Sequence, residues 1–231
     1  MIEPLKTNWN VKISCHLYDV REIENSRSGE RGELPKDDPS TLATEHYALE
    51  KSDDIELLKC PNQIKDHAYT FKDNFKSIKN FVQSLQSTKR AFELIEKDTA
   101  PKDVFVFARP DQLCLGTEKI TKTDFDWSIP NYGFNGGIND RFVICNGLNS
   151  AKIFSGKIKR IENFCKDLQS PLHPERFLLY CAVINRLKVH LNNFKFQRAR
   201  LNGIKNKENF RSRSKLRLTI NKFRILLKMR N

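Results

Sequence analysis

The chain has 231 residues, of which 39% are hydrophobic and 10% aromatic, and it carries a formal net charge of +13. This composition is too apolar for a disordered chain and not apolar enough for a membrane bundle. No stretch approaches the roughly 18 consecutive apolar residues of a membrane span, and the start lacks the order of a signal peptide, so we expect a folded cytoplasmic protein.

Three elements are predicted in the first part of the chain. A strand is expected at 10–19, where Val11 and Ile13 alternate with polar residues. The segment 21–40 combines Gly and Pro with many charged residues, which predicts a mobile loop. Apolar residues then recur at helical spacing across 71–97, which indicates one long amphipathic helix or a closely joined pair.

The second half of the sequence indicates further strands and helices. The segment 103–115 (DVFVFARPDQLCL) starts with successive apolar residues, which is typical of a central strand buried on both faces. A strand, a crossover helix and a second strand form a βαβ unit, so we expect a mostly parallel sheet. A glycine-rich loop and a short strand follow within 124–146. Two helices are predicted next, near 150–168 and from Pro174 to about residue 187, before a last short strand, KVHL.

The positive charge is concentrated near the C-terminus. Residues 186–231 contain fifteen Lys or Arg residues and a single acidic residue, Glu208, whereas the rest of the chain is close to neutral. We divide the chain into an α/β domain at 1–203 and a basic helical tail at 204–231.

The tail predicts an amphipathic helix in which apolar residues share one face. These residues are Leu216, Ile220, Phe223 and Leu227. Three interpretations are open. The helix could lie on an anionic surface at the inner face of a membrane, it could bind the phosphates of nucleic acid, or it could pack on the domain with its charges in water.

Arg109 and Asp111 are the first candidate site residues. Open parallel sheets bind ligands at the carboxyl ends of their strands, and both residues follow a predicted strand. An arginine can pair with phosphate, and a carboxylate can hold a divalent metal or a ribose hydroxyl, as a nucleotide diphosphate requires. A structural ion pair that closes the turn at Pro110 is the alternative.

Further acidic residues are candidates in later segments. Asp124 and Asp126 form a D-x-D motif that could chelate Mg²⁺ or Mn²⁺, or could be solvated in an ordered turn. Asn139 and Asp140 follow glycines that allow close approach to a ligand, so Asp140 could bind a sugar or act as a base. A plain β-turn is the alternative there. Glu175 either stabilises the start of a helix or points into a cleft.

Five segments, taken in order, resemble one known family. They are NFVQSLQSTKRAFELI, VFVFARPDQLCL, NGGINDRFVICN, LHPERFLLYCAVINRLKVH and FQRARLNG, and they lie within residues 71–203. The order is similar to that of poorly characterised bacterial and viral proteins with a GT-A type glycosyltransferase fold. The resemblance implies a three-layer α/β/α Rossmann-like fold. Such proteins usually open with a strand and a Gly- and Arg-bearing loop, so this chain would lack the first strand.

The resemblance also implies roles for individual residues. Arg109 and Asp111 would bind the donor diphosphate or its metal, and Asp140 would act on the sugar or in catalysis. Glu175 would be a second catalytic residue, on the acceptor side. The other expected donor-binding residues are Asn139, Arg198 and Arg200. The expected ligands of Mg²⁺ or Mn²⁺ are Asp111, Asp124 and Asp126.

These features together lead to one expected function and two alternatives. We expect a glycosyltransferase-like protein that moves a sugar from a nucleotide-diphosphate donor to a glycan or a lipid-linked acceptor. One alternative is a noncatalytic protein whose basic C-terminal helix contacts nucleic acid or a partner. The other is a shortened or inactive homologue, because the opening strand and its nucleotide-binding loop are not found.

Overall fold

A computed structural model gives the fold of residues 10–25, 30–33, 44, 46–51, 76–116, 120, 124–199, 205, 207–212 and 215–229. Within these residues short strands are interspersed with helices, and the class is mixed α/β, as the sequence predicts. Both parallel and antiparallel strand pairs occur. None of the helices in the described ranges is long and apolar enough to cross a membrane.

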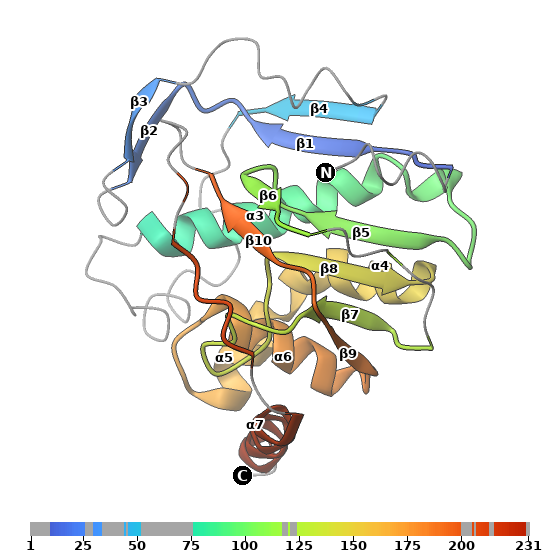
Figure 1. The fold of residues 1–231 in the computed structure, drawn as a ribbon, viewed down its shortest axis with the longest axis vertical. Coiled ribbons are helices and arrows are strands. Elements are labelled where there is room, and N and C mark those ends of the chain that lie inside the picture. The colour runs from blue at the N-terminus through green and yellow to red at the C-terminus, as the bar shows by residue number, and fades with distance from the viewer. Residues whose placement is uncertain are drawn as a thin grey trace.

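A four-stranded sheet lies at the centre of the described fold (Figure 1). Its strands, in spatial order, are β5 (Val104–Ala108), β8 (Phe142–Asn146), β7 (Trp127–Pro130) and β9 (Val189–Asn192). β8 is antiparallel to both of its neighbours, whereas β7 and β9 are parallel. This sheet is therefore not the mostly parallel one that we expected.

The direction of β8 follows from β7, a strand within the segment that the sequence predicts to be a loop. β7 has only four residues and ends at Pro130, and both properties weaken a strand signal. The loop 131–141 joins β7 directly to β8, and adjacent strands joined by a loop run antiparallel. From β8 the chain passes through helices to β9, which pairs in parallel with β7.

The segment 103–115 is divided into two strands. β5 lies at one edge of the four-stranded sheet, and after a turn the chain forms β6 (Gln112–Cys114), which pairs antiparallel with β10 (Phe196–Arg198). Phe105 is buried whereas Val106 is exposed, so β5 is not buried on both faces as we expected. An apolar run does not reveal which strands flank it, so its pattern could not separate an edge strand from a central one.

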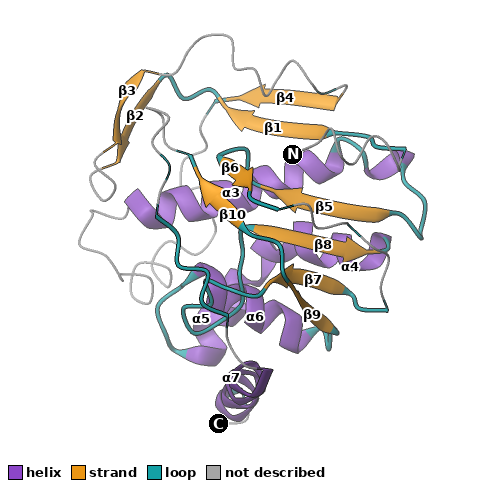
Figure 2. Cartoon of the chain, viewed as in Figure 1, coloured by secondary structure: helices purple, strands orange, loops and turns teal. Residues whose placement is uncertain are grey.

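The helices before and between the strands of the four-stranded sheet lie on one of its faces (Figure 2). They are α3 (Lys76–Glu93), α4 (Leu148–Ser155), α5 (Ile161–Leu168) and α6 (Pro174–Ile184), with short 3₁₀ helices η3 (Glu96–Asp98) and η4 (Gly156–Arg160). The helix predicted within 71–97 is confirmed over Lys76–Glu93, after which the chain turns and forms η3. The helix predicted at 150–168 is confirmed with η4 between α4 and α5, and α6 begins at Pro174 as predicted.

Alternate side chains of β8 belong to two hydrophobic clusters. Val143 and Cys145 are part of the main core beneath the helices. Phe142 and Ile144 belong to a smaller cluster with Phe196 of β10. This alternation follows from the two-residue period of a strand, and it attaches the β6–β10 layer to the sheet.

The strand predicted at 10–19 is confirmed as β1 (Ser14–Tyr18), which pairs in parallel with β4 (His46–Glu50). This pair is bonded to α3 through buried His16. Ser87 of α3 donates from Oγ to His16 O at 2.9 Å, and the same Oγ lies 3.0 Å from His16 Nδ1. The two-stranded sheet is therefore attached to the helix that leads into β5.

Part of the 21–40 segment is regular. β2 (Glu22–Asn25) and β3 (Glu30–Glu33) pair antiparallel, with Ile23 opposite Gly32. Polar strands can pair in this way because their backbone groups bond to one another. For these residues the expected mobile loop is wrong, and the remainder of the segment lies outside the described residues.

The basic tail contains α7 (Lys215–Lys228), which packs on α5 and α6. Ile225 is buried in the main core, and Leu218 packs against the same core. Lys228 Nζ donates to Leu168 O, the last residue of α5, at 3.3 Å. The third interpretation of the tail, packing on the domain, therefore holds for one face of this helix.

Candidate functional site

The antiparallel pairing of β5 and β8 places Arg109 and Asp140 at the same edge of the sheet. By this edge we mean the side of the sheet where β5 ends and β8 begins, and not an edge strand. Ala108 lies opposite Phe142, so the residue after β5 and the residues before β8 share one edge. Arg141 directly precedes β8 and lies at this edge too. The charge of Arg109 acts on Asp140, which shows that the two groups are electrostatic neighbours.

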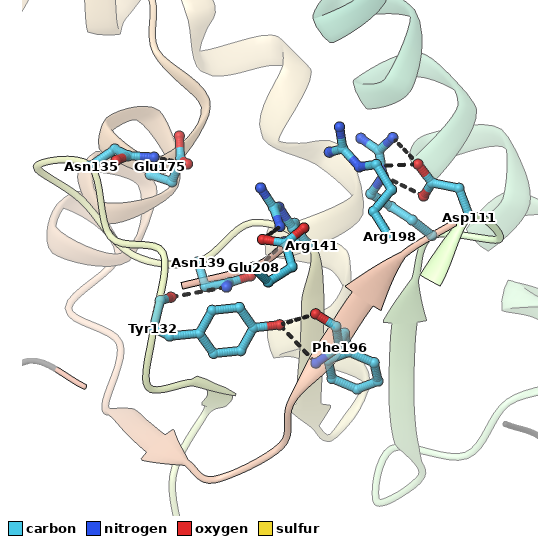
Figure 3. Close-up of polar contacts among 10 residues, drawn as sticks. Asp111, Tyr132, Asn135, Asn139, Arg141, Glu175, Phe196, Arg198 and Glu208 are labelled. Carbon is cyan, nitrogen blue, oxygen red and sulfur yellow. Dashed lines mark hydrogen bonds and ion pairs between the residues drawn. The ribbon is translucent and has the colours of Figure 1, made fainter. Parts of the chain in front are cut away.

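Arg109 and Arg198 share the carboxylate of Asp111 (Figure 3). Arg109 donates to it from Nε and Nη2, both at 2.9 Å, and Arg198 Nε lies 3.3 Å from Oδ2. Partial burial alone would raise the pKa of Asp111, but the hydrogen bonds and charge of Arg109, with the charge of Arg198, hold it below the ordinary value. The group therefore keeps one positive charge in excess. Arg200, which we also expected at the donor, lies outside the described residues.

Asp140 and Glu175 are interacting carboxyl groups with different environments. Burial raises the pKa of Asp140, and the charge of Glu175 raises it further. Arg109 and Arg141 act in the opposite direction but do not cancel the rise. Burial would also raise the pKa of Glu175, but the contact with His173 holds it below the ordinary value. Carboxyl groups whose pKa values are pushed apart are typical of acid and base pairs in active sites.

Glu175 is held from two sides at the start of α6. Its Oε1 accepts a hydrogen bond from Asn135 Nδ2 at 2.8 Å, and its Oε2 lies 2.9 Å from His173 Nδ1. The backbone of the glycine-rich loop also docks here, because Ile138 N donates to Glu175 O at 3.0 Å. A Cβ at Gly137 would lie only 1.8 Å from the same oxygen. The glycine at 137 thus allows the loop to approach α6, rather than a ligand as we expected.

Asn139 is buried, and its side chain is bonded within the protein. Its Nδ2 donates to Tyr132 O at 3.0 Å, and its Oδ1 accepts from Arg141 N at 2.9 Å. An amide in this position fixes the turn that leads into β8. The direct donor contact that we expected from Asn139 is therefore corrected to a structural role that positions Asp140.

Arg141 and Glu208 form an ion pair that the sequence did not predict. Arg141 Nη1 donates to Glu208 Oε2 at 2.9 Å, and the two side chains are 25% and 13% exposed. The segment around Glu208 also packs on the domain, because the ring of Phe210 meets that of Tyr132 edge-on at 5.0 Å. The signal that could have identified Glu208 was its position as the single acidic residue among the basic residues of 186–231.

The charged groups at this edge come from several segments of the chain. In Figure 3 the Arg141–Glu208 pair lies between Glu175 on one side and Asp111 on the other. We refer to the whole set as the sheet-edge cluster, and its members are Arg109, Asp111, Asp140, Arg141, Glu175, Arg198 and Glu208.

Asp124 and Asp126 lie at the opposite edge of the sheet. Asp126 precedes β7, whose first residue pairs with Cys145 near the end of β8. Its Oδ2 accepts from Lys188 N at 2.7 Å, so it fixes the start of β9. These residues therefore lie away from Asp111, and a metal site formed by the D-x-D motif itself stays a prediction. Among the described residues no group of three or more His, Cys, Asp or Glu side chains is arranged to hold a metal.

The sheet-edge cluster combines two chemical capacities. Its arginines can bind phosphate oxygens through charged hydrogen bonds, and Asp140 can accept a proton closer to neutral pH than an ordinary aspartate.

No family model, no curated protein and no solved structure matches this chain.

Proposed function

We propose that this chain is a glycosyltransferase-like protein whose sheet-edge cluster binds a sugar joined to a nucleotide diphosphate. The observation that carries the proposal is the presence of Arg109, Arg198 and Asp140 at one edge of the sheet. Guanidinium groups suit phosphate because their donors match two oxygens at once. The order of sequence motifs supports the same class, and a three-layer GT-A type fold is part of this proposal.

In the proposed reaction Asp140 takes the proton of an acceptor hydroxyl. The hydroxyl oxygen bonds to the anomeric carbon while the bond from that carbon to the diphosphate oxygen breaks. The nucleotide diphosphate leaves with that electron pair, and the charges of Arg109 and Arg198 stabilise it. The raised pKa of Asp140 favours a base that works near neutral pH. Glu175 would then hold the acceptor, a glycan or a lipid-linked molecule.

Asp111 is poorly suited to hold Mg²⁺ or Mn²⁺. Both of its carboxylate oxygens are engaged by Arg109, and Arg198 adds a second positive charge beside them. A metal ion at this carboxylate would have to displace an arginine. In this proposal the positive charge at the diphosphate comes from the arginines.

The proposal is tested by measuring thermal unfolding with a panel of nucleotide sugars, nucleoside diphosphates and nucleoside monophosphates. A ligand that binds the folded state raises the unfolding midpoint, and we expect diphosphates to raise it more than monophosphates. The proposal fails if diphosphates stabilise the protein no more than monophosphates do.

The catalytic part is tested separately with Asp140→Asn. This variant should still be stabilised by the donor but should not release nucleoside diphosphate in the presence of acceptors. Asp124→Asn, at the opposite edge of the sheet, is the matched control and should keep the activity of the unchanged protein. Donor binding by the unchanged protein without any turnover would identify a noncatalytic homologue and would remove the base role from Asp140.

A further inference from the structure

Helix α7 uses one face to pack on the domain. Leu218 and Ile225, seven residues apart, lie on the same face and contact the main core. Lys228 extends from this helix to the end of α5. The remaining faces of the helix therefore point away from α5 and α6.

The outward face of α7 is apolar and exposed. Ile220, Phe223 and Leu227 are spaced three and four residues apart, so they form one stripe, and they are 43%, 61% and 47% exposed. Leu226, three residues after Phe223, is exposed as well. A contiguous apolar surface of this kind is unfavourable in water and marks a docking surface. We refer to Ile220, Phe223 and Leu227 as the outer stripe.

The charge around the outer stripe has one sign. The helix contains five basic residues and no acidic one, namely Lys215, Arg217, Lys222, Arg224 and Lys228. The side chain of Arg224 is exposed next to Phe223 of the stripe. A partner for this surface must therefore offer an apolar layer together with negative charge.

These two requirements separate the possible occupants. A second copy of the chain, docked through the same stripe, would place like charges such as those of Arg224 against each other, which opposes association. Nucleic acid offers phosphates but no apolar layer for Phe223 and Leu227. An anionic bilayer offers acyl chains beneath negatively charged headgroups, and basic amphipathic helices lie in that interface.

We propose that α7 docks this protein on an anionic lipid bilayer through the outer stripe. The helix would lie in the plane of the interface, with Phe223 inserted toward the acyl chains and Arg224 at the headgroups. Because Leu218 and Ile225 already contact the core, the helix docks without leaving the domain. This inference is independent of the proposed transferase reaction, although a lipid-linked acceptor would lie at the same surface.

The test is sedimentation of the full chain with vesicles of phosphatidylcholine alone and of phosphatidylcholine mixed with phosphatidylglycerol. We expect binding to the anionic vesicles and little binding to the neutral ones. Phe223→Ser should weaken the binding about tenfold or more, because a large apolar side chain no longer leaves water. Arg224→Gln should weaken it about fivefold, which is the effect of one basic residue near a charged surface.

A matched control is Leu115→Ser, which removes an apolar side chain of similar exposure, 46%, from the end of β6. This variant should bind the vesicles as the unchanged protein does. Thermal unfolding of each variant checks that the fold is kept. We expect the fold to be kept, because the outer stripe is exposed.

Three results would overturn the inference. One is vesicle binding that does not respond to Phe223→Ser. Another is the absence of vesicle binding together with tight binding to an oligonucleotide. The third is a dimer in analytical ultracentrifugation that dissociates in Phe223→Ser, which would assign the outer stripe to a second copy of the chain.

Discussion

Arg109 holds Asp111, two residues later, in a bidentate pair in which Nε and Nη2 of the guanidinium donate to different carboxylate oxygens at 2.9 Å. A second arginine–aspartate pair with the same spacing lies elsewhere, where Arg21 Nε is 2.8 Å from Asp19 Oδ1. Among the residues that the structure describes, only the first of these two pairs is approached by another arginine, Arg198. The two pairs therefore provide a matched comparison between a site and a surface contact.

Arg109→Gln should lower the affinity for a nucleoside diphosphate about ten- to a hundredfold, because it removes charged hydrogen bonds to phosphate. The free energy of unfolding should change by less than about 1 kcal/mol, since the Arg109 side chain is 44% exposed and the pair is screened by water. Isothermal titration and urea unfolding measure the two quantities. Arg21→Gln is the control, and an equal loss of affinity in both variants would contradict a specific role for Arg109.

The raised pKa of Asp140 has a consequence for stability. A carboxyl group whose pKa is higher in the folded state binds protons more tightly there than in the unfolded chain. The contribution of Asp140 to the free energy of unfolding therefore falls as the pH rises from the ordinary pKa of 3.8 through the raised pKa of the folded state. Asp140→Asn removes this loss, so the variant should be more stable than the unchanged protein at neutral pH.

The measurement is urea unfolding of both proteins over a pH series. The difference in the free energy of unfolding should be largest at neutral pH and should shrink as the pH falls below the ordinary aspartate value. A difference that does not depend on pH would show that Asp140 does not titrate in this way. Asp124→Asn reports the general effect of an Asp to Asn change at an exposed position.

Glu208→Gln tests whether Glu208 occupies a position that an anionic ligand could take beside Arg141. Loss of the negative charge should raise the affinity for inorganic phosphate about fivefold, because Arg141 then keeps its full charge for the ligand. The same change should destabilise the fold by about 1–2 kcal/mol, since a mostly buried ion pair is broken. Glu93→Gln, which weakens a surface pair with Lys89, should alter neither quantity measurably.

Phosphate titration and urea unfolding give the two results for Glu208→Gln. If phosphate affinity does not rise, Glu208 is a structural partner of Arg141 and competes with no ligand. If stability does not fall either, the pair contributes nothing measurable to the position of the 207–212 segment.

Gly137→Ala should disturb the contact between the glycine-rich loop and α6. Its Cβ would lie 1.8 Å from Glu175 O, a backbone atom, so the loop or the helix must move. Overpacking of this kind costs about 1–3 kcal/mol, and movement of Glu175 should also reduce any donor-dependent activity. Urea unfolding measures the cost.

Gly156→Ala is the control for this change, because a Cβ at Gly156 meets nothing within 4 Å and its φ of −81° is open to alanine. This control should be neutral or stabilising by about 0.4–1 kcal/mol. Equal destabilisation by both substitutions would show that loss of glycine, and not the contact at Glu175, is responsible.

The sequence identified the helices better than the sheet. The apolar period of α3 and the Pro174 start of α6 are local signals, and both were predicted correctly. The order and direction of strands depend on contacts between distant segments, which no local pattern records. β7 was missed for this reason, and with it the antiparallel direction of β8.

The position of Asp140 beside Arg109 does not follow from the parallel sheet that we expected. In a parallel sheet the carboxyl ends of the strands share an edge, which places Arg109 and Asp111 there. Asp140, however, precedes β8, so in a parallel arrangement it would lie at the opposite edge from Arg109. The antiparallel register of β5 and β8 brings the two residues together. Glu208 was missed because its contact with Arg141 spans 67 residues of sequence.

Strand β8 packs on both of its faces, with alternate side chains in different hydrophobic clusters. This packing fixes the position of the charged residues that precede the strand. A slip of one residue along β5 would turn Phe142 toward the helices and Val143 toward β10, and neither layer has space shaped for the exchange. Asp140 and Arg141 stand directly before this strand, so the same slip would displace both from Arg109 and Glu208. The fit of apolar side chains inside the protein therefore determines the distances between the charged groups at its surface.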